Sequence, residues 1–133
     1  MIENQIKSFF ENEKDIVAVY LFGSYASGRV RSNSDIDLAI LFDSRNRPAI
    51  NRRLDKYLIG LSRILRKDTH LTAMDFASEG LLKQIFKKGK CIIVNDTKIM
   101  AYFKMISYSK IVDFRYHRRK MQSGVIRQVM RGL

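Results

Sequence analysis

Residues 20–42 read YLFGSYASGRVRSNSDIDLAILF, and this stretch decides both the fold and the candidate site. The apolar run from Ile16 to Phe22 predicts a buried strand, and both of its faces are apolar, which is typical of a central strand. Gly23 and Ser24 then predict a tight turn that leads into a short helix. After a polar and basic loop, a second strand is predicted from Asp35 to Phe42.

Asp35 and Asp37 open the second predicted strand with one residue between them. Because side chains alternate along a strand, both carboxylates project from one face, and Ile36 and Leu38 project from the other. Neighbouring carboxylates repel each other unless a cation lies between them. Mg²⁺ is usually bound by one or two carboxylates together with the phosphates of a substrate. The spacing therefore predicts a divalent cation site.

The turn at Gly23 and Ser24 has the complementary chemistry. Glycine permits a positive φ or a close approach of another group to the backbone. Ser24 adds a hydroxyl, and the N–H groups that follow it can face an anion at the start of a helix. The turn and the acid pair together predict a site that binds phosphates and a cation side by side.

This joint pattern resembles the nucleotidyltransferases of the DNA polymerase beta type. Their motif is Gly-Ser, a gap of ten residues and then Asp-x-Asp, which stands here as Gly23-Ser24, residues 25–34 and Asp35-Ile36-Asp37. The small size is similar to the minimal nucleotidyltransferase (MNT) family, which includes the MntA-type antitoxins encoded beside HEPN toxins. The resemblance implies an α/β (α+β) fold with a small mixed sheet of about four strands and helices packed on it.

The resemblance also implies an activity. A member of this family would transfer AMP from ATP to a protein hydroxyl, here a tyrosine of a cognate HEPN ribonuclease toxin, and would so act as antitoxin. Asp35 and Asp37 would bind Mg²⁺ and carry the catalysis, while Gly23 and Ser24 would hold the nucleotide. Many relatives have an arginine where this chain has Ser27, so Arg29, or else Arg31, is expected to replace its phosphate contact.

The third acidic position of the family departs from its pattern. Relatives commonly add a carboxylate from a neighbouring strand, which completes a two-metal site. Counting back from Met74-Asp75, Ala77 and Gly89 places that position at His70. Imidazole is a poor ligand for Mg²⁺. If the strand register differs, Asp68 or Asp75 would substitute for His70.

Two other functions stay open because of this departure. One is an antitoxin with the same fold and an impaired site, which neutralises its toxin by binding alone. The other is an RNA-modifying nucleotidyltransferase, which the basic composition would suit. Transfer of label to a protein, to RNA or to neither would separate the three.

Charge is the most unusual feature of the composition. The 133 residues carry a net charge of +12, and residues 98–133 contain nine lysines and arginines against one acid. Such a chain should attract nucleotides, nucleic acid or an acidic protein. We expect one domain over residues 1–133, with a basic C-terminal helix from about residue 98. That helix would dock on a partner or on nucleic acid, or would be an exposed face without a partner.

The remaining signals favour a cytoplasmic protein. No apolar run reaches the ~18 residues that a membrane span requires, so no membrane contact is expected. The N-terminal residues are amphipathic and carry acids, which excludes a signal peptide. The single Cys91 excludes an internal disulfide and is predicted to be a small buried residue.

Periodicity predicts the remaining elements. Helices are expected over Ile2–Lys14, from Pro48 to about Lys67, from Ala77 to Lys88 and over about Lys98–Met121, and strands over Thr69–Met74 and Cys91–Val94. Gly89 is predicted to cap the helix that ends at Lys88.

Overall fold

The computed structural model describes residues 2–28, 35–43 and 49–112. Its elements are α1 (Ile2–Phe10), β1 (Ile16–Phe22), α2 (Ser24–Ser27), β2 (Ile36–Phe42), α3 (Ile50–Leu65), β3 (Thr69–Ala73), the 3-10 helix η2 (Met74–Phe76), α4 (Glu79–Lys88) and β4 (Lys90–Val94). Residues 97–112 form a further helical segment. The predicted continuation of this helix to Met121 lies outside the described residues. None of the helices in the described ranges is long and apolar enough to cross a membrane.

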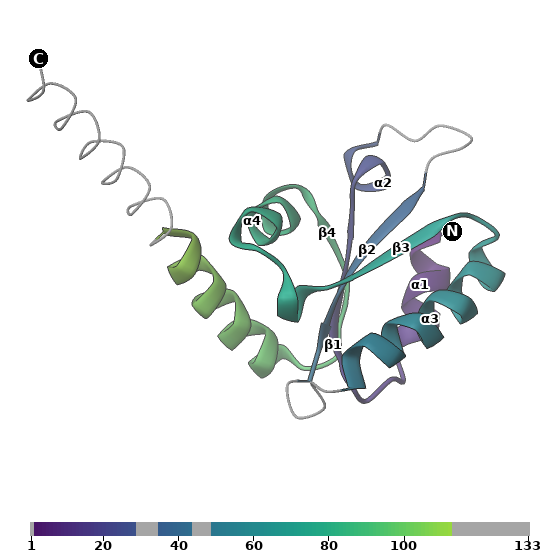
Figure 1. The fold of residues 1–133 in the computed structure, drawn as a ribbon, viewed down its shortest axis with the longest axis horizontal. Helices are drawn as coiled ribbons and strands as arrows, with labels where there is room; N and C mark the ends of the chain where they lie inside the picture. The colour runs from purple at the N-terminus through teal and green to yellow at the C-terminus, as the bar shows by residue number, and fades with distance from the viewer. Residues whose placement is uncertain (1, 29–34, 44–48, 113–133) are drawn as a thin grey trace, which may run out of the picture.

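The strands form one mixed sheet in the order β3-β2-β1-β4 (Figure 1). β1 pairs antiparallel with β2 and β4, whereas β2 and β3 run parallel. The predicted fold class and the central place of β1 are therefore confirmed. The sheet register puts the end of β1 beside the beginning of β2, because Phe22 is opposite Asp37.

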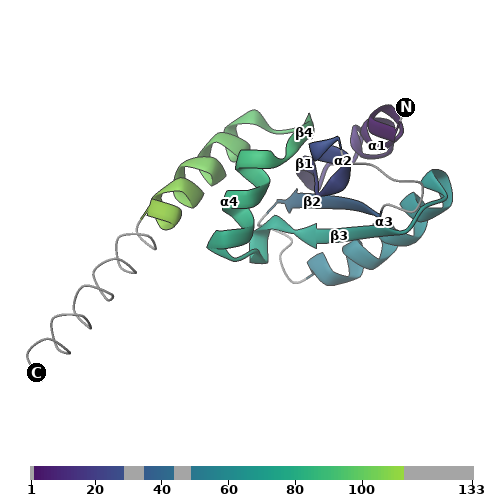
Figure 2. The ribbon, with the colours of Figure 1, turned by 90° about the horizontal axis from the view of Figure 1, so that it is seen from above.

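Helices cover both faces of the sheet (Figures 1 and 2). α1 and α3 lie on one face, and α4 and residues 97–112 lie on the other. Each face has its own buried cluster. The first includes Ile6, Phe10 and Leu61 with Leu38 of β2, and the second includes Leu82, Ile85 and Met100 with Leu41 of β2.

The alternation along β2 decides the direction of the acid pair. Leu38 and Ile40 join the cluster beneath α1 and α3, while Ala39 and Leu41 join the cluster beneath α4. Asp37 lies on the same side of β2 as Ala39 and Leu41, so its side chain points to the α4 face. β2 is buried along the rest of its length, and Asp37 is only partly covered. The acids therefore lie where the α4 face opens to solvent.

Helix α1 is shorter than predicted, because it ends at Phe10 and not at Lys14. The side-chain amide of Asn95 donates to the carbonyl oxygens of Phe10 and Ile16 at 3.1 and 3.0 Å, and to that of Glu13 at 3.4 Å. These bonds add to the backbone hydrogen bonds that the carbonyls of Phe10 and Glu13 already accept within the turn after α1. A residue distant in sequence thus fixes the connection from α1 to β1.

Gly89 caps α4 in an extended conformation, not in the left-handed one that its glycine suggested. Its backbone packs closely, because a Cβ added there would lie 2.3 Å from the carbonyl oxygen of Ile85. Gly80, within the same helix, has nothing within 4 Å of an added Cβ.

We therefore expect opposite effects of alanine at these two glycines. Gly89→Ala should lower the free energy of unfolding by about 2 kcal/mol, since the clash is with backbone. Gly80→Ala should raise it by about 0.5–1 kcal/mol, since alanine favours a helix interior. Urea denaturation of both variants measures the difference. Equal effects at the two positions would contradict the close packing of Gly89.

Candidate active site

The centre of the candidate site is the contact between Gly23 and Asp37. A Cβ added to Gly23 would lie 2.5 Å from Asp37 Oδ2, so the carboxylate lies directly against the turn. Gly23 has φ 74° and ψ −149°, a backbone conformation that is essentially restricted to glycine. Gly23 and Asp37, which lie 14 positions apart in the sequence and at the ends of two neighbouring strands, are therefore in contact.

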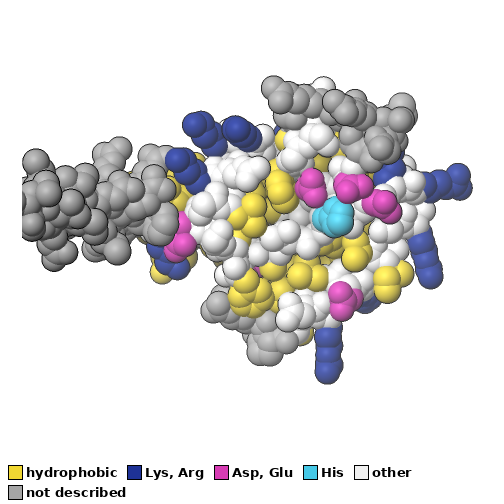
Figure 3. Space-filling model, turned by 45° about the horizontal axis from the view of Figure 1, so that its top comes forward, with side chains coloured by type: hydrophobic (Ala, Val, Ile, Leu, Met, Phe, Trp, Pro, Cys, Tyr) yellow, Lys and Arg dark blue, Asp and Glu magenta, His cyan; other side chains and the backbone are white. Residues whose placement is uncertain are grey.

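Asp35 and His70 extend the site toward the edge strand β3. Asp37 is the register partner of His70 in the parallel pair of β2 and β3. His70 Nε2 lies 3.2 Å from Asp35 Oδ2, and the two side chains are 63% and 48% exposed. Figure 3 shows the resulting face, on which acidic side chains gather around a histidine. His70 thus stands beside the acid pair, on the face that strand alternation predicts.

The electrostatics of the site centre on the partly buried carboxylate of Asp37. Partial burial raises the pKa of Asp37, the nearby Asp35 raises it further, and His70 opposes both. The ionised form of Asp37 is therefore less favourable in the folded protein than it is in water. A cation or a cluster of phosphate-binding donors at this place would reverse that preference.

The turn continues into α2, which has only four residues. Tyr25, the second residue of α2, is partly buried against the core beneath α1 and α3. Lys67, in the connection from α3 to β3, donates from Nζ to Tyr25 Oη and also lies 5.2 Å from the centre of its ring. This contact ties α2 to the connection that leads into β3, and it so helps to position the Gly-Ser turn relative to β3. Arg29 and Arg31, the predicted phosphate contacts, lie outside the described residues.

Asp75 does not take the place of His70. Asp75 Oδ1 accepts a hydrogen bond of 3.0 Å from the backbone N–H of Phe42, at the far end of β2. Phe42 is five positions along β2 from Asp37, which separates their backbones by roughly 17 Å. Asp68 lies just before β3, and its carbonyl oxygen accepts from the N–H of Ile36. The observed register therefore keeps His70 opposite Asp37.

The donor set suits one Mg²⁺ and does not complete a protein-only cage. Within residues 2–28, 35–43 and 49–112, no three His, Cys, Asp or Glu side chains come together in a way that could hold a metal ion. Two carboxylates side by side, with a Gly-Ser turn against one of them, would suit an Mg²⁺ that is shared between protein and substrate phosphates. The residues present therefore fit the cation only together with a phosphate ligand.

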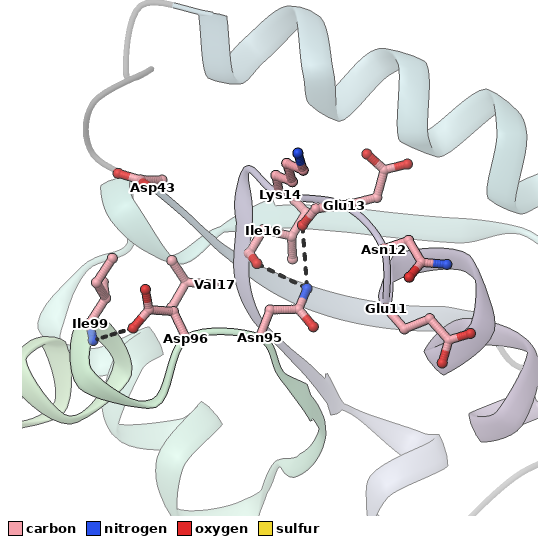
Figure 4. A pocket seen from close by; sticks show the side chains of 10 residues that line it. All are labelled: Glu11, Asn12, Glu13, Lys14, Ile16, Val17, Asp43, Asn95, Asp96 and Ile99. Carbon is pink, nitrogen blue, oxygen red and sulfur yellow. Dashed lines mark hydrogen bonds between the residues drawn. The ribbon is translucent and has the colours of Figure 1, made fainter.

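A separate hollow of about 410 Å³ lies at the opposite end of the sheet (Figure 4). Its lining includes the acids Glu11, Glu13, Asp43 and Asp96, and Asn95 makes its bonds to the α1–β1 connection there. Asp43 follows the last residue of β2, whereas Asp37 lies at its beginning. The lining holds no Gly-Ser turn against a carboxylate, so we do not take this hollow as a second candidate for the nucleotide.

Cys91 departs from its prediction, because it is exposed and not buried. It lies on β4, which forms an edge of the sheet, and edge strands are less covered than central ones. Partial burial still raises the pKa of its thiol. The residue is thus not an activated nucleophile.

Comparisons with known proteins identify the family of this chain. The family model described as polymerase beta, nucleotidyltransferase matches residues 4–98. The protein adenylyltransferase MntA of Shewanella oneidensis is 36% identical over 90 residues, which are 66% of this chain and 62% of that protein. The chain therefore matches less than two thirds of the length of this relative.

Solved structures extend the similarity to the whole chain. A crystal structure of a toxin–antitoxin with AMP-PNP matches with a TM-score of 0.69 and 27% identity, over 98% of this chain and 99% of that one. The structure of a tri-AMPylated Shewanella oneidensis HEPN toxin in complex with an MNT antitoxin matches with a TM-score of 0.62 and 25% identity. The match covers 97% of this chain and 96% of that one. Since the family model spans both the Gly-Ser turn and the acid pair, this protein belongs to the polymerase beta nucleotidyltransferase family.

Proposed function

We propose that this protein transfers AMP from ATP to a hydroxyl, a tyrosine, of a cognate HEPN toxin and so acts as its antitoxin. The observation that carries the proposal is the contact of Asp37 with the turn at Gly23, which brings a cation-binding carboxylate against a phosphate-binding backbone. The similarity to MntA, named a protein adenylyltransferase, and to toxin–antitoxin structures supports this reaction over other transfers.

Each residue of the site has a separate task in this proposal. The backbone at Gly23, the Ser24 hydroxyl and Arg29 hold the β- and γ-phosphates of ATP. Asp35 and Asp37 bind Mg²⁺ from the other side, with Asp37 closest to the turn. When bound, Mg²⁺ neutralises charge on the phosphates and orients them for in-line displacement. His70 does not belong to this ligand set, and it hydrogen-bonds to Asp35 instead.

The reaction balances as a single displacement. The oxygen of the acceptor hydroxyl forms a bond to the α-phosphorus, and the bond from that phosphorus to the bridging oxygen of the β-phosphate breaks. Pyrophosphate leaves, and the acceptor keeps AMP as a phosphodiester. A carboxylate of the acid pair takes the hydroxyl proton. The protein contributes chiefly position and charge neutralisation, as is usual in phosphoryl transfer.

A second function shares the fold and the partner but lacks the chemistry. It is favoured by His70, which stands where a third carboxylate would complete a two-metal site and is 63% exposed. In this case the protein neutralises the toxin by occluding it. A cytoplasmic location and any contact with nucleic acid remain predictions from composition.

One experiment separates the two. The protein, Mg²⁺ and α-³²P-labelled ATP are incubated with the cognate HEPN toxin and, in parallel, with RNA. We expect label on the toxin, and its loss in Asp35→Ala. Binding of the toxin without label would support occlusion, and label on RNA would support an RNA-modifying enzyme.

His70→Asp provides the matched gain of function. A third carboxylate beside Asp35 should strengthen Mg²⁺ binding, because carboxylate oxygens suit this ion better than imidazole. We expect transfer to reach half its maximal rate at a lower Mg²⁺ concentration. An unchanged Mg²⁺ dependence would show that this position takes no part in the site.

A further inference from the structure

The helical segment 97–112 has an exposed row of large apolar side chains. Tyr102, Met105, Tyr108 and Val112 are 62%, 60%, 49% and 61% exposed, and we call these four residues the apolar stripe. Their spacing of three, three and four residues places them on one side of a helix. Contiguous apolar surface of this kind is uncommon on a soluble protein and marks an interaction site.

The apolar stripe is not the side that holds the helix on the sheet. Met100 and Ile111 are 4% and 7% exposed and belong to the cluster beneath α4. Ser107, on the same side, is 3% exposed. Figures 1 and 2 both show residues 97–112 beside α4. The helix is thus anchored mainly through this buried face. Tyr108 of the stripe adds a ring contact with Phe86 of α4, at 5.5 Å between the ring centres, whereas Tyr102, Met105 and Val112 each stay more than half exposed.

The charges around the apolar stripe are of one sign. Residues 97–112 contain Lys98, Lys104 and Lys110 and no carboxylate. By helical spacing, Lys98 lies one turn before Tyr102. Lys104 lies beside the row, with its Nζ 5.9 Å from the centre of the Phe86 ring of α4, and Lys110 projects from another side of the helix. An apolar centre with a polar rim is the usual anatomy of a protein interface, and tyrosine and methionine are enriched in such centres. The rim here is complementary to an acidic surface.

We propose that the apolar stripe is the docking surface for an acidic face of the toxin. This inference rests on the proposed function, because it names the surface that delivers the acceptor. A second copy of this chain fits poorly, since two such helices would bring lysines against lysines. Nucleic acid fits poorly too, because its binding relies on charge and not on an apolar centre.

The position of the stripe agrees with delivery to the site. Residues 97–112 pack on the α4 face of the sheet through Met100 and Ile111. Asp37 points to that same face, as the alternation along β2 shows. A protein held on the stripe is therefore on the side of the sheet where the acid pair opens, and it can present a hydroxyl without crossing the edge of the sheet.

The test compares a negative charge introduced into the stripe with a negative charge introduced elsewhere. Met105→Glu and Val112→Glu place a carboxylate in the stripe, and Ile59→Glu is the matched control. Ile59 is 57% exposed and lies on α3, on the other face of the sheet. Each full-length variant is titrated with the purified cognate toxin, and its circular dichroism and its binding of a fluorescent ATP analogue with Mg²⁺ are measured in parallel.

We expect each stripe variant to raise the Kd for the toxin about 30-fold or more, as for a residue at the centre of an interface. Ile59→Glu should change it less than about threefold, and all three variants should still bind the ATP analogue. Wild-type affinity should fall as NaCl is raised, because the rim is charged.

Three results would overturn the proposal. The stripe variants bind the toxin as the wild type does, or Met105→Glu instead dissolves a wild-type dimer in sedimentation, or it abolishes binding to anionic vesicles and leaves the toxin bound. Failure of the proposed function looks different. In that case the wild type binds the toxin through the stripe, and no AMP is transferred.

Discussion

Asp37→Asn should lower the rate of AMP transfer about a thousandfold, the equivalent of about 4 kcal/mol in the barrier. The side chain keeps its shape but loses the charge that lies against the turn at Gly23. Binding of the toxin should stay within a few-fold of the wild type, since Asp37 is not part of the apolar stripe. Single-turnover transfer of labelled AMP at saturating toxin measures the chemical step directly.

The same substitution should raise the thermal stability of the protein without Mg²⁺ at neutral pH. Burial raises the pKa of Asp37, so the folded protein holds its proton more tightly than the unfolded chain does. The associated stability is present at low pH and is lost as the pH rises through the folded-state pKa. At neutral pH the wild type lacks that stability, whereas asparagine never carries the unfavourable charge.

Asp75→Asn is the matched control for both measurements. Asp75 caps the far end of β2 through the N–H of Phe42. It should keep nearly full transfer, and it should not gain stability. A variant at Asp37 that keeps more than about a tenth of the wild-type rate would remove this residue from the catalytic set. A Tm that falls would show that Asp37 has a structural role instead.

Sequence reasoning found the centre of the site because both halves of it are local. Gly23 needs a conformation that other residues avoid, and Asp35 and Asp37 share a face by alternation alone. The position of His70 followed from the family resemblance, and the parallel pairing of β2 with β3 places it opposite Asp37. The strand order needed the structure.

Contacts between distant segments escaped prediction. Periodicity extended α1 to Lys14, whereas the helix ends at Phe10. Nothing in the sequence near Lys14 shows that Asn95, 85 residues after Phe10, donates a hydrogen bond to the Phe10 carbonyl. The role of Asp75 could not be read either, because its partner Phe42 is 33 residues away. Tyr57 was missed in the core of α3, where its ring is edge-on to Phe10 and its hydroxyl donates to Glu13.

Gly23→Ala should reduce transfer at least about a hundredfold and should also destabilise the protein. The new Cβ would lie 2.5 Å from Asp37 Oδ2, so the carboxylate must leave its place against the turn. The backbone conformation adds strain of about 1–3 kcal/mol for any residue but glycine. Activity falls because the acid is displaced from the phosphates, and stability falls because of both effects.

Gly28→Ala separates strain from displacement. Gly28 has the same φ of 74°, but an added Cβ meets nothing within 4 Å. It should therefore lower the free energy of unfolding by about 1 kcal/mol, the cost of a left-handed residue with a Cβ. If the collision with Asp37 is what matters, Gly23→Ala should cost much less stability in an Asp37→Ala background, where the obstructing oxygen is absent. Additive stability losses in that double variant would mean that backbone strain alone accounts for the effect of Gly23→Ala and that Asp37 is not held against the turn.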